Sequence, residues 1–557
     1  MTTPEYEERV VSPDDSIEVT VDIVDGVARY SVAAGGTTYV DPSPLGLEFA
    51  DQPPFGTAVT GTGPEIAVTD SKTTAATETW TPEWGDFGAV SEEYRSLALT
   101  LTETTGPGRS ATVEVRVFDD GLGFRLHLKE GFGAFTIVSE NTEFDFASDY
   151  TAWWITNEFV NPRYEQEYAE SVLSDIPAGT RPIEPNDNQV RWGAHTPLTM
   201  RADDGTYLSV HEADLEAYAA MSLAAVDDSG GHRMAAELAP LPDGTKVTAT
   251  APHSTPWRTI QISPDPGGLI ESQLIPLLAP ERDDSVLPTD ANGEVDTEWL
   301  HSRKYVGIWW LMIAGSAHWE YKSDEQLRAE GIDPATYIHG ARTERMERYL
   351  HFASEHGFDS VLVEGWNEGW DTYPGDGTGF EMGLADSYPD FDVGRVLDYG
   401  ESQDPPVETT IHNETGGNVV NYEAEIDDGI FAEYDAAGIH SIKNGYVSDP
   451  GLGLEGDGSY PTHNHHCQRA VEHHRTVIGE AASHRQMLEI HEGAEPAGEI
   501  RTYPNVGARE VVRAQEFDGF GDLMANVGRT HHVTIPFTRM LAGPTRSQPG
   551  IFDATFS

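Results

Sequence analysis

Short alternations of apolar and polar residues run through the first half of the chain. Examples are residues 16–23, 111–118 and 123–128, in which nearly every second residue is apolar. Clusters of Gly, Asp, Asn and Pro separate these runs. A period of two with frequent turns is typical of antiparallel strands that have one buried and one solvated face. The pattern predicts a large β-sandwich over residues 1–288, although a barrel built from hairpins would show the same periodicity.

The pattern changes after residue 288. Short apolar runs at 305–310, 360–364, 409–412, 441–443, 487–491 and 533–537 alternate with helix candidates such as residues 343–356. Gly357 follows that candidate, and glycine commonly ends a helix before the next strand. Repeated strand–helix units with continuously apolar strands predict a parallel sheet. We therefore expect residues 289–557 to form a (β/α)8-type barrel, so that the chain is a multidomain β plus α/β protein.

Polar residues stand where these predicted parallel strands end. They are Glu364, His412 with Glu414, Lys443, and His491 with Glu492. The carboxyl ends of the strands carry the active site in (β/α)8 enzymes. Buried carboxylates at such positions are costly unless they are paired, protonated or bound to a metal. The strand ends are therefore the candidate active site.

Carboxylates and tryptophans in this region indicate carbohydrate chemistry. Two carboxyl groups that flank a glycosidic bond act as general acid and general base. Trp309 and Trp310 lie beside the first predicted strand and offer flat apolar faces to pyranose rings. The alternative is that the tryptophans belong to the core and that the acids belong to an acidic surface. The pattern alone leaves both interpretations open.

The charge balance excludes several classes of partner. The chain has 34 Lys and Arg against 94 Asp and Glu, a net charge of −60. Nucleic acids and anionic membranes both require clustered positive charge, so neither is an expected partner. Only six residues are lysine, and near-absence of lysine with dispersed acids is typical of proteins from a high-salt cytoplasm. At ~1 M salt the Debye length falls to ~3 Å, which screens self-repulsion.

Targeting and redox signals are sparse. The first residues contain no apolar stretch of the signal-peptide kind, and no run of ~18 apolar residues predicts a membrane span. These observations predict a cytoplasmic location. The single cysteine, Cys467, excludes an intrachain disulfide.

Eight segments resemble glycoside hydrolase family 97. In the second half they are residues 361–367 (VLVEGWN), 411–416 (IHNETG), 442–447 (IKNGYV) and 491–498 (HEGAEPAG). In the first half they are residues 43–47 (SPLGL), 211–215 (HEADL), 257–260 (WRTI) and 274–278 (LIPLL). The resemblance covers nearly the whole chain in order. It implies an N-terminal β-super-sandwich, a (β/α)8 barrel, a C-terminal β-domain, calcium in the active site and, for most members, action on α-glucosides.

The resemblance also implies roles for individual residues. Glu516, in the segment RAQEF (513–517), matches the general acid, and Glu414 and Glu492 match the bases that position water. The implied calcium ligands are Glu212, Glu492, Glu510 and Glu516. The implied sugar contacts are Glu364, His412 and Lys443, with Trp309 or Trp310 as the ring platform. The expected substrate is an α-gluco-oligosaccharide.

One position separates the stereochemical branches of the family. The resemblance implies that retaining members of the family carry an aspartate nucleophile two residues after the lysine of the fourth strand. Here that position is Gly445, which has no nucleophile. With Glu414 and Glu492 present, this predicts inversion, with the acid and base ~6.5–9.5 Å apart. A retaining α-galactosidase is the disfavoured alternative.

The end of the chain leads to a further expectation. Seven strand candidates precede residue 541: the six runs above and a further one around Tyr503 or beyond it. No eighth follows, because Gly543-Pro544 and Pro549-Gly550 interrupt the sequence. We expect a barrel that is incomplete at its C-terminal end, without the family's C-terminal β-domain, and a second polypeptide that completes it. The alternatives to an active enzyme are a non-catalytic carbohydrate-binding remnant and one half of a split glycosidase.

Overall fold

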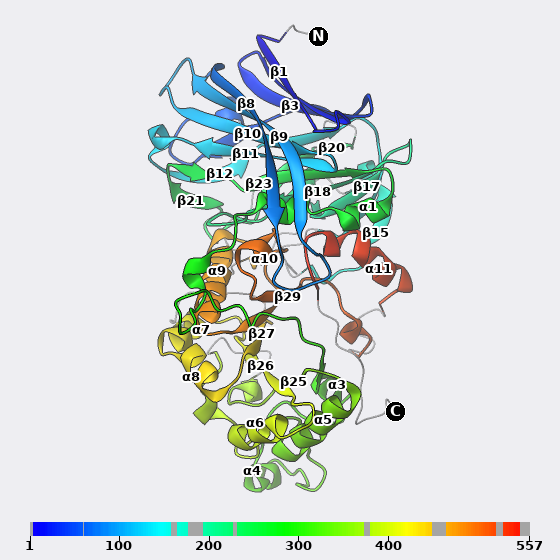
Figure 1. Ribbon diagram of the computed structural model, residues 1–557, viewed down its shortest axis with the longest axis vertical. Helices are drawn as coiled ribbons and strands as arrows, with labels where there is room; N and C mark the ends of the chain where they lie inside the picture. Colours follow the sequence, from blue (N-terminus) through cyan, green and yellow to red (C-terminus); the bar gives the residue numbers. More distant parts are fainter. Residues whose placement is uncertain are drawn as a thin grey trace.

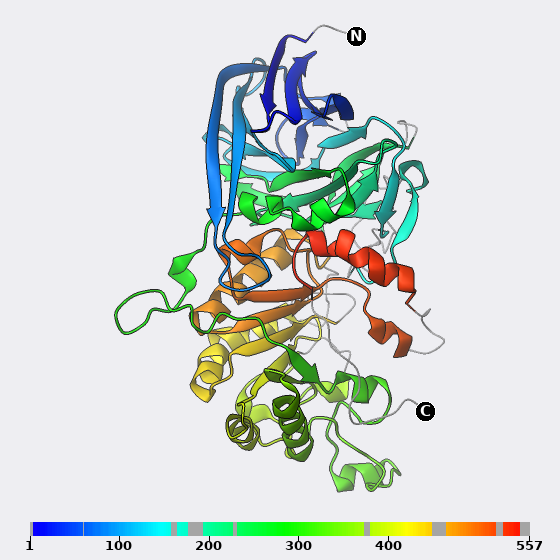
Figure 2. The same cartoon turned by 45° about the vertical axis from the view of Figure 1, so that its right-hand side comes forward.

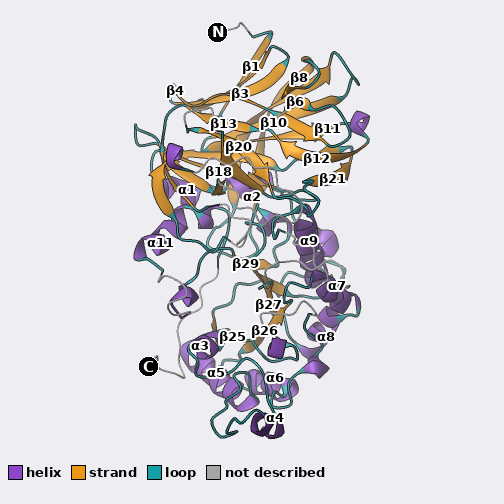
Figure 3. Cartoon of the chain, turned by 180° about the vertical axis from the view of Figure 1, so that it is seen from behind, coloured by secondary structure: helices purple, strands orange, loops and turns teal. Residues whose placement is uncertain are grey.

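The chain folds into two halves stacked along the long axis of the molecule (Figure 1). A computed structural model describes residues 4–58, 61–156, 164–176, 193–226, 231–372, 379–447, 464–519 and 527–545. Strands make up the N-terminal half, whereas helices and one further sheet make up the other half (Figure 3). This division agrees with the change of pattern after residue 288.

Three antiparallel sheets build the N-terminal half. The first runs β1 (Tyr6–Val11), β2 (Ile17–Val24), β3 (Val27–Ala34), β4 (Thr37–Pro44), β13 (Glu143–Phe146), β20 (Arg233–Leu238), β19 (Met221–Ala225) and β16 (Ala194–His195). A smaller sheet runs β21 (Val247–Thr250), β12 (Ala134–Glu140), β5 (Gly46–Phe49), β6 (Phe55–Ala58) and β7 (Gly61–Thr62). Each sheet contributes apolar side chains to one continuous core.

The largest sheet faces the second half of the molecule. It runs β15 (Ala169–Val172), β14 (Thr151–Trp154), β17 (Leu198–Arg201), β18 (Tyr207–Ala213), β23 (Trp257–Ser263), β11 (Gly121–Leu128), β10 (Ser110–Phe118), β9 (Val90–Glu103) and β8 (Ile66–Trp80), and β22 (His253–Ser254) pairs with β11. Burial alternates along β2 and β10 as the sequence predicts, because successive side chains of a strand point to opposite faces. The antiparallel strands predicted for the N-terminal half are therefore present as three sheets.

Six parallel strands form the sheet of the second half. In order they are β24 (Tyr305–Gly307), β25 (Ser360–Val363), β26 (Glu408–Glu414), β27 (Ser441–Gly445), β28 (Met487–His491) and β29 (Val506–Glu510). Neighbours in sequence are neighbours in the sheet, and β25 is buried along its whole length. Within the described residues the expected (β/α)8 barrel is therefore a half-barrel.

Helices connect the strands of the half-barrel and fill the junction with the sandwich. They are α1 (Pro266–Glu271), α2 (Leu274–Leu278), α3 (Trp309–Ile313), α4 (Asp324–Ala329), α5 (Thr343–His356), α6 (Val393–Glu401), α7 (Val419–Asp427), α8 (Ile430–Ala437), α9 (Gln468–Ser483), α10 (Glu499–Thr502) and α11 (Arg529–Thr534). The predicted helix 343–356 is confirmed, and Gly357 ends it in the left-handed conformation (φ 72°). In the described part of the chain, no helix has the length and apolarity that a membrane span requires.

Two strand predictions are wrong. The run 305–310 is a strand only to Gly307, and Trp309 and Trp310 begin helix α3. The run 533–537 ends helix α11 and continues as a 3₁₀ turn over Ile535–Phe537. Pro536 has no N–H for a ladder, and the hydroxyl of Thr534 donates to the carbonyl of Thr530 one turn earlier. These local bonds favour a helix over the β-propensity of the apolar residues.

Loops of the half-barrel are fixed from the sandwich side. The long β8–β9 hairpin reaches down to the half-barrel (Figure 2), and Nε1 of Trp84 at its tip donates to the carbonyl of Pro504 at 2.6 Å. His211 on β18 donates through Nε2 to the carbonyl of Pro496 at 2.8 Å, and the N–H of Asp214 donates to Ala497 at 2.8 Å. The segment that follows β28 is therefore held by main-chain bonds to the other half.

Glu499, at the start of α10, gives this junction a pH dependence. It is buried and lies 2.7 Å from Nε of Arg509. Burial alone would raise the pKa of this carboxyl group, but Arg509 and then Arg475 hold it at about 2. A lowered pKa means that the folded state is stabilised above the unfolded pKa and loses that stabilisation as pH falls towards 2.

We expect Glu499→Gln to lower the free energy of unfolding by about 3 kcal/mol above pH ~4.5, and the difference from wild type to vanish as pH falls towards 2. Thermal unfolding in molar KCl across this range measures it. Glu480→Gln, at an exposed position on α9, is the control and leaves stability unchanged. A difference that persists at pH 2 would contradict the assigned ion pair.

Candidate functional site

The ends of β25 and β27 bring a buried ion pair to the centre of the half-barrel. Nζ of Lys443 lies 2.6 Å from Oε1 of Glu364, and both side chains are at most 2% exposed. Glu364 directly follows β25 and Lys443 lies near the end of β27. Since lysine is nearly absent from this sequence, a buried lysine at a strand end marks a position where a positive charge is required.

His412 on β26 connects this pair to the first candidate base. Its Nδ1 lies 3.8 Å from Oε1 of Glu364, and its Nε2 lies 3.5 Å from Oε2 of Glu414. Nε1 of Trp366 donates to the carbonyl oxygen of His412 at 2.9 Å and fixes the strand there. Two carboxylates from adjacent strands therefore stand on either side of one imidazole.

Glu414 is a buried carboxyl group with two backbone donors. Its Oε1 accepts hydrogen bonds from the N–H groups of Gly416 at 2.9 Å and Val447 at 3.3 Å. Burial, and then the negative charge of Glu492, raise the pKa of Glu414 to about 7. A carboxyl group with a pKa near neutrality is suited to accept a proton from water.

Glu492, the second candidate base, occupies a strained turn. It follows β28 with φ 50°, a left-handed conformation that is rare for a residue with a Cβ atom. Its Oε2 accepts from the N–H of Tyr446 and from Nδ1 of His491, both at 3.1 Å. Strain at an active-site residue persists only when the surroundings over-determine the conformation.

The residues after Glu492 supply that constraint. Gly493 also has positive φ, and a Cβ atom there would lie 2.5 Å from Nε2 of His474. Nη1 of Arg509 donates to the carbonyl of Ala494 at 3.2 Å. Buried Arg539 lies 2.8 Å from Oε2 of Glu495, so the segment after β29 also clamps this loop.

His491 links Glu492 to the candidate metal ligand Glu510 at the end of β29. Its Nδ1 lies 3.1 Å from Glu492 and its Nε2 lies 2.7 Å from Oε2 of Glu510. Burial alone would lower the pKa of His491, but the charges of Glu492 and Glu510 raise it well above the usual value. The two carboxylates therefore converge on a cationic group.

Tryptophans form one wall of the site. Nζ of Lys443 lies 5.2 Å from the ring centroid of Trp309, whose buried indole N–H has no hydrogen-bond partner among the described residues. Trp319 stacks on Trp370 at 5.0 Å, and Trp370 lies 5.6 Å from the ring of His412. Trp310 is half-buried and follows Trp309 on α3. An unpaired buried donor beside a lysine is available to a hydroxyl group of a ligand.

Glu516, the candidate acid, comes from outside the sheet. It lies in the 3₁₀ turn Gln515–Gly519, is 8% exposed, and its turn packs against α3. The turn that carries Glu516 therefore lies beside the helix of Trp309 and Trp310, whereas Glu414 and Glu492 stand at the ends of β26 and β28. Carboxyl groups that flank a glycosidic bond can protonate a leaving group and activate a water.

The expected calcium ligands are not gathered around one point. Among the described residues, no group of three or more His, Cys, Asp or Glu side chains is arranged to hold a metal ion. Glu492 and Glu510 converge on His491, as described. Both carboxylate oxygens of Glu212 are engaged elsewhere, with Nη1 of Arg258 at 2.6 Å and the N–H of Met221 at 2.9 Å.

A different glutamate lies in a segment that packs near the end of β29. Tyr164 packs against Val511, the residue after Glu510, and Glu165 follows Tyr164 with 8% exposure. No pattern in the sequence marks Glu165, because one glutamate in an acidic chain carries no local signal. The donor chemistry fits calcium, since Ca²⁺ prefers hard carboxylate oxygens and Glu492 and Glu510 already surround a positive charge.

Family models match both halves of the chain. Residues 10–280 match the model "Glycosyl-hydrolase 97 N-terminal", and residues 309–512 match "Glycoside hydrolase 97". A solved family 97 enzyme from Pseudoalteromonas sp. strain K8, in complex with acarbose, is 31% identical with a TM-score of 0.84 over 99% of this chain and 75% of that one. A variant of that enzyme in complex with panose matches equally well.

Another relative has a different activity. It is a retaining α-galactosidase of Bacteroides thetaiotaomicron, 22% identical over 96% of this chain and 72% of the relative. The branch within the family is therefore open on these comparisons. The identity of 31% over most of a solved enzyme, with models matching both halves, shows that this chain belongs to glycoside hydrolase family 97.

Proposed function

We propose that this glycoside hydrolase cleaves α-glucosidic bonds of α-gluco-oligosaccharides with inversion of configuration. Glu516 donates a proton to the leaving oxygen, and Glu414 with Glu492 removes a proton from the attacking water. The bond from the anomeric carbon to the leaving oxygen breaks as the bond to the water oxygen forms on the opposite face. The ligands in the two Pseudoalteromonas complexes, acarbose and panose, support α-glucosides as the class.

The space at Gly445 carries the proposal of inversion. A Cβ atom at this position would lie 2.5 Å from Nε2 of His412 and closer still to Oε2 of Glu414. Any side chain there, including a nucleophilic aspartate, would have to displace one of these two groups. A side chain at 445 would therefore move the carboxylate of Glu414 or the imidazole of His412 from the position that it holds here, which favours a water molecule as the nucleophile.

The ion pair and the tryptophans hold the sugar. Lys443 donates to hydroxyl groups and Glu364 accepts from them, and both are fixed before the substrate arrives because each locks the other. The ring of Trp309 provides an apolar face beside Lys443.

Proton NMR of maltose hydrolysis in molar KCl tests the function. We expect β-glucose as the first product, because inversion at an α-linked anomeric carbon gives the β-anomer before mutarotation. Melibiose in a parallel reaction tests the alternative, a retaining α-galactosidase, which is the activity of the Bacteroides relative. Release of α-galactose first would establish a retaining galactosidase and overturn the proposal.

We further propose that calcium binds between Glu492, Glu510, Glu516 and Glu165, with Glu165 in place of Glu212. Bound calcium would offset the repulsion between the clustered carboxylates and keep Glu492, Glu510 and Glu165 ionised at neutral pH, whereas Glu516 would have to carry the proton that it donates. Glu212 instead stabilises the fold by pairing with Arg258, which also binds Glu140 at 2.6 Å. The two glutamates are thus assigned to different tasks that one experiment separates.

Calorimetric calcium titration of the chelator-treated chain measures the assignment. We expect Glu165→Gln to weaken calcium binding at least ~10-fold, as even indirect contacts to a metal are worth ~10–100-fold. Glu212→Gln, the matched control, leaves calcium affinity unchanged but lowers the melting temperature, because Arg258 loses a buried partner. Loss of calcium affinity in Glu212→Gln with none in Glu165→Gln would restore Glu212 as the ligand.

A further inference from the structure

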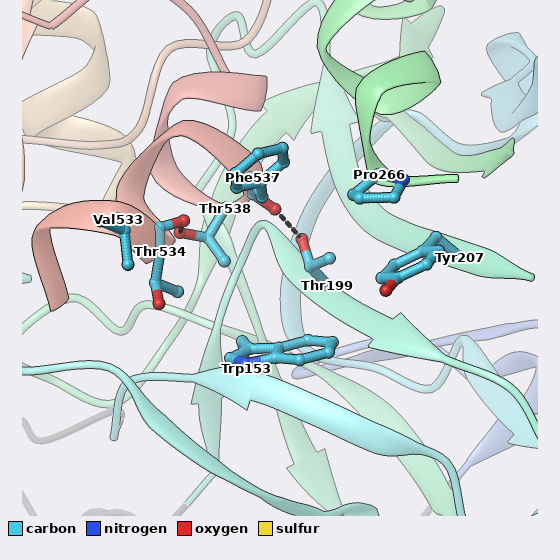
Figure 4. A pocket seen from close by; sticks show the side chains of 8 residues that line it. All are labelled: Trp153, Thr199, Tyr207, Pro266, Val533, Thr534, Phe537 and Thr538. Atoms are coloured by element: carbon cyan, nitrogen blue, oxygen red, sulfur yellow. Dashed lines mark hydrogen bonds between the residues drawn. The ribbon is translucent and has the colours of Figure 1, made fainter. Parts of the chain in front are cut away.

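An apolar pocket lies on the sandwich, outside the site described above. Strands β14, β17 and β18 form its floor, and α1, α11 and the 3₁₀ turn Ile535–Phe537 form its walls (Figure 4). Its volume is 190 Å³, smaller than the ~300–1,000 Å³ of sites for drug-sized ligands. It therefore has room for a single small ring.

Two aromatic side chains give the pocket a flat surface. The rings of Trp153 and Tyr207 are nearly parallel, 17° apart with centroids at 6.2 Å. Pro266 and Phe537 lie on the other side of the cavity from the indole of Trp153 (Figure 4). A pyranose ring presents faces of C–H bonds that pack on such planar apolar surfaces.

Three threonine hydroxyl groups in the pocket already donate hydrogen bonds to backbone carbonyl groups. Thr199 donates to the carbonyl of Phe537 at 2.8 Å, Thr534 to that of Thr530 at 2.8 Å, and Thr538 to that of Thr534 at 2.9 Å. Each oxygen can still accept a hydrogen bond. The pocket is therefore complementary to a ligand whose hydroxyl groups donate hydrogen bonds. The bond from Thr199 to Phe537 holds two of its sides together before a ligand binds.

The lining carries no charge. All of its described side chains are neutral, although the chain contains 94 acidic residues. Val533 at its rim is 65% exposed, which is unusual for a large apolar side chain. A neutral, hydroxyl-rich ring with apolar faces fits this lining, whereas an ion does not.

We propose that this pocket is a second, non-catalytic carbohydrate site that holds one hexopyranosyl residue of an α-glucan. The choice of an α-glucan rests on the proposed function, whereas the site itself rests on the pocket. Binding a distant part of a polymer here would raise the effective concentration of its chain ends near the half-barrel.

Depletion of the protein from molar KCl by insoluble starch tests the site. The starting protein is the full chain with Glu364→Gln and Lys443→Met, so that the catalytic site contributes little to binding. We expect this chain to bind starch, and Trp153→Ala to weaken binding by about tenfold or more. Phe87→Ala, at an aromatic residue that is 45% exposed outside the pocket, is the control and keeps full binding.

Val533→Arg is a second test that leaves the packing of the core unchanged, because Val533 is exposed. Its exposed position tolerates a larger side chain, which would block the mouth of the pocket and abolish binding to starch. The proposal would be overturned if starch did not deplete the starting protein. It would also be overturned if starch depleted the Trp153→Ala and Val533→Arg variants as fully as the starting protein. A starting protein that does not bind starch but self-associates, with the self-association lost in the Val533→Arg variant, would also overturn it. A failure of maltose hydrolysis alone would leave this result unaffected.

Discussion

Replacing Glu414 with glutamine lowers kcat for maltose by about 10²–10⁴-fold, the range expected for loss of a general base. The amide oxygen can still accept from Gly416 and Val447, so the loop keeps its geometry. The carboxyl group has a pKa of about 7, mainly through burial, and its neutral replacement therefore costs the fold little. Steady-state kinetics and thermal unfolding measure the two effects together.

Azide distinguishes loss of the base from general damage. An azide ion attacks without giving up a proton, so it replaces water as the nucleophile while Glu516 still protonates the leaving oxygen. We expect azide to restore turnover of the Glu414→Gln variant and to give β-glucosyl azide, visible by NMR. A variant that keeps more than about a tenth of its kcat would remove Glu414 from the role of base.

Glu364→Gln is expected to destabilise the fold by about 3–5 kcal/mol, because it leaves Lys443 buried without its partner. The combined Glu364→Gln and Lys443→Met chain should recover much of this loss, since no buried charge remains. Neither chain should hydrolyse maltose at the wild-type rate, because both lack the groups that bind the sugar. Thermal unfolding in molar KCl gives the stability of each variant.

An exposed ion pair provides the control. Arg328 and Asp324 on α4 lie 2.7 Å apart, but both side chains are more than 60% exposed. Asp324→Asn should change stability by less than ~0.5 kcal/mol, because water and salt screen such a pair. Equal losses for Glu364→Gln and Asp324→Asn would mean that burial does not make the central pair special.

Local patterns predicted the elements that local forces determine. The helix 343–356 ends at Gly357 as expected, and polar residues after apolar strands converge because parallel strands end at one edge. The run 533–537 failed, since side-chain bonds one turn apart and Pro536 outweighed strand propensity. The pattern of apolar and polar residues does not show such hydrogen bonds.

Long-range pairings explain the other gaps. Glu212 and Arg258 are 46 residues apart and meet only because β18 and β23 are neighbours in one sheet. The segment of Glu165 comes near the end of β29 through the packing of Tyr164 on Val511, which no spacing in the sequence reveals. Residue types at strand ends therefore indicated the chemistry, whereas the partner of each carboxylate depended on the tertiary structure.

The close approach of Gly445 to Glu414 and His412 constrains how this site can evolve. A mutation that places aspartate at 445 first would collide with both neighbours. A mutation that shortens Glu414 first would make room but leave the water without its base. Each single change is therefore expected to lower activity. Libraries that vary positions 414 and 445 together should for this reason recover active variants more often than libraries that vary one position at a time.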